Sequence, residues 1–169
     1  MRKNCALAML LWILLLFHAG ARERVLVLTD ISNEPDDEQS LVRFLVYANE
    51  YDIEGLIATT SQHLRKKPRE DLIRRQIAAY SKVKDNLSAH VDNYPDAGKL
   101  LKVTATGQPG YGMQAVGEGK QSPGSRLLLE TADRDHEKPL WVSVWGGANT
   151  LAQALFDARK ERNVEGIKK

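Results

Sequence analysis

The order of hydrophobic segments along the chain indicates an α/β protein. A continuous aliphatic run, residues 25–28, ends in Thr29 and Asp30, as is typical of a strand buried on both faces of a parallel sheet. The next segment, residues 36–50, carries apolar side chains at the spacing of an amphipathic helix, namely Leu41, Phe44, Leu45 and Ala48. A second apolar run, residues 53–60, predicts another strand, so the three segments form a β–α–β unit with a right-handed crossover.

The rest of the chain continues this alternation of strands and helices. The same patterns predict a helix from Pro68, a helix over residues 94–103, a helix over 122–129, a strand over 140–145 and a helix over 150–160. We therefore expect one α/β domain over residues 22–169, built as three layers, with a mostly parallel sheet and helices on both faces.

Glycine is frequent in residues 107–124, which lie between two predicted helices. This segment is not a phosphate-binding loop, because Gln121 follows Gly119 and Lys120 where that motif needs Ser or Thr. The composition predicts either a mobile loop that covers the crevice at the carboxyl ends of the strands or a flexible connector.

The first 21 residues have the pattern of a secretory signal peptide. Arg2 and Lys3 precede an apolar core over residues 6–17, and small residues at 19–21 offer a cleavage site. We expect cleavage near Arg22 and a secreted or periplasmic product that does not stay in the membrane; a retained membrane anchor is the alternative.

The charge balance argues against a nucleic-acid-binding role. The chain has 24 Lys and Arg residues against 22 Asp and Glu residues. Arg2 and Lys3 account for the whole surplus, so the remainder is balanced, whereas domains that bind nucleic acids carry a basic excess. A small-molecule glycoside or a polysaccharide is a better expectation for the partner, and the sequence leaves the oligomeric state open.

Three carboxylates are predicted to gather where the first strand ends and the first helix begins. Asp30 follows the strand, and Asp36 and Asp37 open the helix. Hard oxygen donors in one loop suit Ca²⁺ or Mg²⁺, and a cation would relieve their mutual repulsion. In the alternative interpretation, Asp36 and Asp37 complement the helix dipole and Asp30 ends the strand in a turn.

Other polar and aromatic residues follow the remaining strands and should share the same crevice. Ser61, Gln62 and His63 come after the second strand, and His63 is a candidate proton donor or substrate ligand, with a solvent-facing loop histidine as the alternative. Trp145 ends the last strand, where it either stacks on substrate or packs in the core. Trp141 is expected in the core.

These segments resemble the amino-terminal motif of the nucleoside hydrolases, and more closely the nucleoside hydrolase-like domain of the Sde182-type "cellulose-binding" proteins. The resemblance implies that Asp30 activates the attacking water and that Asp30, Asp36 and Asp37 hold Ca²⁺. The junction at 146–149 resembles one whose backbone carbonyl also ligates calcium, which implies that role for Asn149. Leu28 stands where the classical motif has another Asp.

The same resemblance implies hydrolysis of an N-glycosidic bond, with Ser61, Gln62, His63 and Trp145 binding substrate. The classical hydrolases hold the sugar with an Asn after the second strand, and here Ser61 and Gln62 occupy that neighbourhood. A carbohydrate-binding protein without catalysis is therefore the alternative. We expect residues 22–169 to be the front part of a truncated domain, in which calcium binding is weak or absent.

Overall fold

The structure is a computed structural model that describes residues 22–32 and 34–162. The predicted signal peptide, residues 1–21, lies outside this part of the chain. The described residues form one parallel sheet in the order β3-β2-β1-β4. Its strands are β1 (Glu23–Thr29), β2 (Tyr51–Ala58), β3 (Thr104–Thr106) and β4 (Leu140–Val144).

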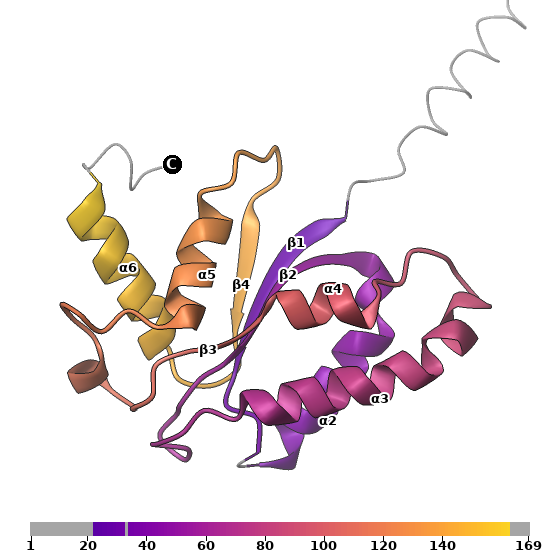
Figure 1. The fold of residues 1–169 in the computed structure, drawn as a ribbon, viewed down its shortest axis with the longest axis horizontal. Helices are drawn as coiled ribbons and strands as arrows, with labels where there is room; N and C mark the ends of the chain where they lie inside the picture. The colour runs from indigo at the N-terminus through magenta and orange to yellow at the C-terminus, as the bar shows by residue number, and fades with distance from the viewer. Residues whose placement is uncertain (1–21, 33, 163–169) are drawn as a thin grey trace, which may run out of the picture.

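Helices cover both faces of this sheet (Figure 1). One face carries α2 (Pro35–Val46), α3 (Glu70–Ser88) and α4 (Ala97–Lys102), and the other carries α5 (Pro123–Ala132) and α6 (Asn149–Glu161). Two single-turn 3₁₀ helices, η1 (Ala48–Glu50) and η2 (Met113–Ala115), lie between them in sequence. The three-layer α/β prediction is confirmed.

Strand β1 lies at the centre of the sheet because its aliphatic side chains divide between the two faces. Val25 and Val27 pack in the core beneath α2, α3 and α4. Leu26 and Leu28 pack in a second core with residues of α5 and α6. Burial on both sides explains the continuous aliphatic run, since neither face of the strand meets solvent.

The strand order creates a switch point at the carboxyl end of β1. The chain runs from β1 outward through β2 and β3, and then returns to place β4 on the other side of β1. The loops that follow β1 and β4 therefore diverge to opposite faces of the sheet. Ligands of open α/β sheets bind in the crevice that such a divergence leaves.

The sequence analysis missed one strand and misplaced one side chain. Strand β3 was not predicted, because its short Thr-Ala-Thr sequence, which pairs with β2, contains no hydrophobic run. Trp141 is 60% exposed, whereas the core was expected. It lies on β4, the edge strand of the described sheet, where its indole N–H donates to Glu23 Oε2 at 3.2 Å.

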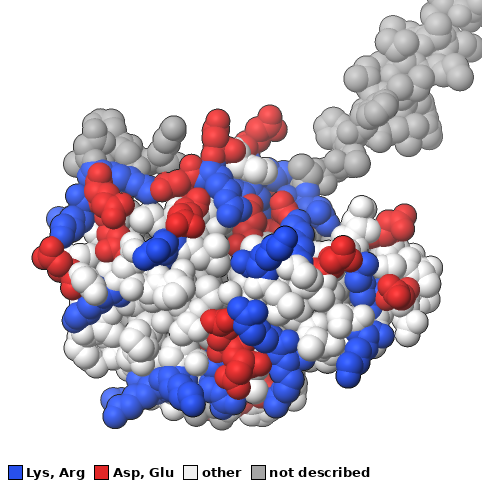
Figure 2. Space-filling model, viewed as in Figure 1, with Lys and Arg blue, Asp and Glu red and all other residues white. Residues whose placement is uncertain are grey.

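Charged side chains of both signs are interspersed over the face shown in Figure 2, in agreement with the balanced composition. Several form surface ion pairs, such as Arg74 with Glu70 (2.7 Å) and Lys99 with Asp52 (3.0 Å). A buried pair of Arg24 and Glu54 joins the amino ends of β1 and β2. Among the described residues, none of the helices combines the length and the hydropathy needed to cross a bilayer.

Candidate functional site

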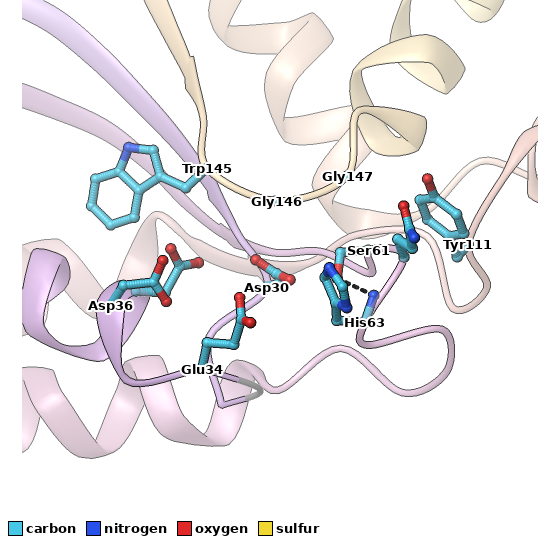
Figure 3. Close-up of a pocket in the computed structure, with 11 residues that line it drawn as sticks. Asp30, Glu34, Asp36, Ser61, His63, Tyr111, Trp145, Gly146 and Gly147 are labelled. Atoms are coloured by element: carbon cyan, nitrogen blue, oxygen red, sulfur yellow. Dashed lines mark hydrogen bonds between the residues drawn. The ribbon is translucent and has the colours of Figure 1, made fainter.

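A pocket of about 240 Å³ opens at the switch point between β1 and β4 (Figure 3). It is lined by Asp30, Glu34, Asp36, Asp37, Ser61, Gln62, His63, Tyr111, Trp145, Gly146 and Gly147. The loops after β1, β2, β3 and β4 each contribute to this lining. Seven of the residues singled out from the sequence therefore meet in one place: Asp30, Asp36, Asp37, Ser61, Gln62, His63 and Trp145.

The last residue of β1 fixes the shape of the acidic loop. The hydroxyl of Thr29 accepts a hydrogen bond from the amide of Ile31 at 3.1 Å and donates one to Asp37 Oδ2 at 2.5 Å. These two bonds turn the chain sharply after the strand and attach the first turn of α2 to it. Asp30 is thereby placed next to Asp37, although seven positions separate them in sequence.

Burial and neighbouring carboxylates raise the pKa of Asp37 to about 6. Burial is the largest cause, and the hydrogen bond from Thr29 opposes it. A hydrogen bond with the Asp30 carboxyl and the negative charges of Asp30 and Asp36 raise the pKa further. Asp30 and Asp37 thus form a carboxyl pair that holds a proton in mildly acidic solution.

The donor atoms of the acidic loop suit a hard divalent cation in kind. Across residues 22–32 and 34–162, no three side chains of His, Cys, Asp or Glu stand in an arrangement that holds a metal ion. Asp30 and Asp37 are joined to each other, and Asp36 acts on Asp37 through its charge. Calcium binding at these residues therefore stays a prediction.

Asn149 connects loops behind the pocket and is not one of its lining residues. It is 5% exposed at the start of α6. Its side-chain amide donates to the carbonyl of Gly110 at 2.6 Å and to the hydroxyl of Thr60 at 3.1 Å. The role implied for its backbone carbonyl as a calcium ligand stays a prediction.

Glycines after β4 bring the backbone close to Asp30. The amide of Trp145 donates to the carbonyl of Leu28 at 2.8 Å, which continues the β1–β4 pairing up to the pocket. A Cβ atom at Gly146 would lie 2.6 Å from Asp30 Oδ1, and one at Gly147 would collide with the carbonyl of Thr60. A side chain at either position would therefore displace the floor of the pocket.

The loop after β2 divides its residues between structural and exposed positions. The Ser61 hydroxyl is engaged by the amides of His63 (3.1 Å) and Leu64 (3.0 Å) and so stabilises the loop (Figure 3). Gln62 and His63 are exposed along the pocket wall. Both of these side chains are open to a ligand, whereas Ser61 is largely buried.

Trp145 packs partly in the core and also lines the pocket, whereas its stacking on substrate stays a prediction. Its ring packs edge-on against Phe44, with centroids 6.1 Å apart and planes at 88°. Its indole N–H donates to the hydroxyl of Ser143 at 3.0 Å. Because the ring is only partly buried and lines the pocket, it offers an aromatic wall with a fixed orientation.

Sequence reasoning missed two residues of the pocket, Glu34 and Tyr111. Glu34 is the exposed residue before α2, and its pattern resembled an ordinary helix start. Tyr111 belongs to the glycine-rich segment, residues 107–124. The interpretation of this segment as a loop that covers the crevice was the indication in the sequence that Tyr111 could reach the pocket. Its amide donates to the carbonyl of Arg65 at 3.1 Å, so this part of the segment is attached to the neighbouring loop.

The comparisons with known proteins agree with this geometry. The family model described as "Cellulose-binding Sde182, nucleoside hydrolase-like domain" matches residues 24–169. A solved structure is similar, with 42% sequence identity and a TM-score of 0.85; it is a nucleoside hydrolase-related hypothetical protein from Saccharophagus degradans that is associated with carbohydrate metabolism.

That similarity covers 88% of this chain and 36% of the other chain, so this chain spans little more than a third of that protein's length. No curated protein matches. The resemblance seen in the sequence and the nucleoside hydrolase-like fold are both confirmed.

Proposed function

Since the chain belongs to the nucleoside hydrolase-like domain family of the cellulose-binding Sde182 proteins, we propose that its pocket hydrolyses an N-glycosidic bond. The observation that carries this proposal is the carboxyl pair of Asp30 and Asp37 at the switch point of the sheet. A carboxylate in that position is able to act as a general base toward a water molecule in the pocket.

Asp30 is the proposed catalytic base. The water oxygen forms a bond to the anomeric carbon while Asp30 takes the water proton. The carbon–nitrogen bond breaks, its electron pair passes to the leaving nitrogen, and that nitrogen takes a proton from His63. The transition state resembles an oxocarbenium ion, whose positive charge the carboxylates of the pocket stabilise.

Asp30, Asp36 and Asp37, with the backbone carbonyl of Asn149, are the proposed ligands of Ca²⁺. Their fit rests on donor chemistry, because three carboxylates line one pocket. A bound cation would lower the pKa of a water molecule, so that Asp30 takes its proton more readily. Because Leu28 offers no oxygen, we expect weak calcium binding.

The test is release of free base from inosine and uridine in the presence of calcium. We expect slow hydrolysis by the wild type and loss of at least 100-fold in Asp30→Asn, a size typical for removal of a general base. Asp92→Asn is the control, because Asp92 is an exposed carboxylate outside the pocket. Equal rates for wild type and Asp30→Asn would contradict the proposal.

A second candidate function is carbohydrate binding without catalysis. Trp141 is 60% exposed and lines an apolar groove of about 490 Å³ beside β4, together with Tyr51 and Trp145. Exposed aromatic rings offer apolar faces on which sugar rings pack. Sedimentation with cellulose tests it: Trp141→Ala should lose binding while Asp30→Asn retains it. Full binding by Trp141→Ala would exclude this groove.

A further inference from the structure

The pocket carries charges of opposite sign at its two ends. Figure 3 shows Asp36 and Tyr111 on opposite sides of Asp30. The carboxylates of the β1–α2 loop line the first end. At the second end, the guanidinium of Arg65 lies over the ring of Tyr111, with its central carbon 5.8 Å from the ring centroid. Because an arginine side chain is always protonated in proteins, this second end is positively charged.

Two loops hold Arg65 at this end of the pocket. Its Nε–H donates to the carbonyl of Gln62 at 3.1 Å, and its own carbonyl accepts a hydrogen bond of 3.1 Å from the amide of Tyr111. Lys66 pairs with Gly110 in an antiparallel bridge, so the loop after β2 lies alongside the segment that carries Tyr111. A guanidinium anchored in this way loses little conformational freedom when a ligand binds to it.

The two terminal nitrogens of Arg65 are free to bind an anion. Across residues 22–32 and 34–162, neither nitrogen donates to a protein acceptor and no carboxylate pairs with this exposed side chain. The next arginines in sequence differ, since Arg69 is paired with Asp71 (2.8 Å) and Arg74 with Glu70 (2.7 Å). Two parallel N–H groups of a guanidinium match two oxygens of a carboxylate or a phosphate.

From this geometry we propose that Arg65 selects substrates that carry a carboxylate or a phosphate away from the bond that is broken. The inference rests on the proposed hydrolysis and names its substrate class, an anionic glycoside. The acidic end favours the same arrangement, because Asp30 and Asp36 repel an anion and so direct it toward Arg65. A neutral glycoside gains neither the attraction nor the orientation.

Calorimetric titrations with uridine, uridine 5′-monophosphate and orotidine test this proposal. The second probe adds a phosphate to the sugar, and the third adds a carboxylate to the base. A chelator is present throughout, so that the phosphate does not bind through a metal ion. The wild type should bind at least one charged probe about tenfold more tightly than uridine, as expected for hydrogen bonds to a charged partner. Preference for the nucleotide places the anion on the sugar, and preference for orotidine places it on the base.

Arg65→Met removes the charge and should abolish this preference while uridine binding stays unchanged. Arg65→Lys keeps the charge but lacks the planar fork, so it should retain only part of the preference. Arg126→Met is the matched control, because Arg126 is exposed on α5 outside the pocket and its Nε–H also donates to an uncharged partner, Gln121, at 3.1 Å. This control should bind all three probes like the wild type.

Three results would overturn the proposal: equal affinity of the wild type for all three probes, no binding of any probe, or equal weakening of all three in Arg65→Met. If Arg65→Met does not fold, titrations of the wild type at about 0.05 M and about 0.5 M salt replace it, and only the charged probe should bind more weakly at high salt. Unchanged affinity for that probe counts against the proposal. Because the titrations measure binding alone, their outcome is separate from the Asp30→Asn test of hydrolysis.

Discussion

The hydroxyl of Thr29 donates a hydrogen bond of 2.5 Å to Oδ2 of Asp37. This bond joins the last residue of β1 to the first turn of α2 and places Asp37 against Asp30. The position of the carboxyl pair thus depends on a side chain that is itself fully buried at the end of the central strand. A small polar residue at the strand end determines the geometry of the proposed catalytic site.

Replacing Thr29 with Val should destabilise the fold by about 1–2 kcal/mol. The substitution removes one acceptor and one donor while keeping the shape, which leaves the Ile31 amide and the Asp37 carboxylate without their partner. Denaturant unfolding measures the loss. Thr29→Ser keeps the hydroxyl and should have nearly the free energy of unfolding of the wild type. A Thr29→Val variant as stable as the wild type would show that the two hydrogen bonds make no net contribution to stability.

The contribution of Asp37 to thermal stability should fall as pH rises from about 4 to about 6. The pKa of Asp37 is about 6 in the folded protein and 3.8 in its ordinary state, so the folded protein binds this proton more tightly than the unfolded chain. Deprotonation through this interval therefore costs folding free energy, and the stabilisation at low pH is lost above the folded pKa.

Melting temperatures measured with a chelator present, for wild type and Asp37→Asn, isolate this effect. Asn cannot ionise, so the variant should show a smaller decrease between pH 4 and pH 6.5. Parallel pH curves for the two proteins would mean that Asp37 has an ordinary pKa in the folded state.

Gly146→Ala should abolish hydrolysis with little change in fold. The added methyl group would lie 2.6 Å from Asp30 Oδ1, so the catalytic carboxylate has to move. Base release and circular dichroism together measure the two effects. Gly98→Ala is the matched control, because a Cβ there meets no atom within 4 Å in α4. That variant should keep activity and gain about 0.5–1 kcal/mol of stability.

Export provides a test of the amino-terminal prediction. Expressed in a bacterium with its own start, the protein should lose residues 1–21 and begin at Arg22. Leu14→Arg would place a charge within the apolar core and should block export. Amino-terminal sequencing of the membrane and soluble fractions decides the matter; an intact Met1 on the membrane product would favour the retained anchor.

The layers of the fold were predictable because buried positions carry hydrophobic residues in a pattern that depends on the type of element. The aliphatic run of β1 and the apolar stripe of α2 each report the environment of one element. Strand β3 shows no such pattern, because it is only three residues long and threonine is also common in loops. Trp141 was misplaced because hydrophobicity alone does not reveal which strand forms the edge of the described sheet.

The candidate site was predictable where its residues follow strands. Asp30 and Ser61 come after β1 and β2, and the parallel topology brings such positions together. Tyr111 was missed because it reaches the pocket through contacts with Arg65 and Asn149 that no local pattern encodes. The hydrogen bond between Thr29 and Asp37 likewise joins residues whose proximity depends on the turn of the loop.

Calorimetric titration with Ca²⁺ is the most direct test of the central claim, that the carboxylates of Asp30, Asp36 and Asp37 form a cation site. The account predicts weak binding by the wild type, with a Kd of about 10⁻⁴–10⁻³ M, in the range of weak extracellular calcium sites. Asp37→Ala should bind no measurable calcium, while Asp92→Ala should match the wild type. A wild type without calcium binding, or an Asp37→Ala variant that binds calcium equally well, would contradict the claim.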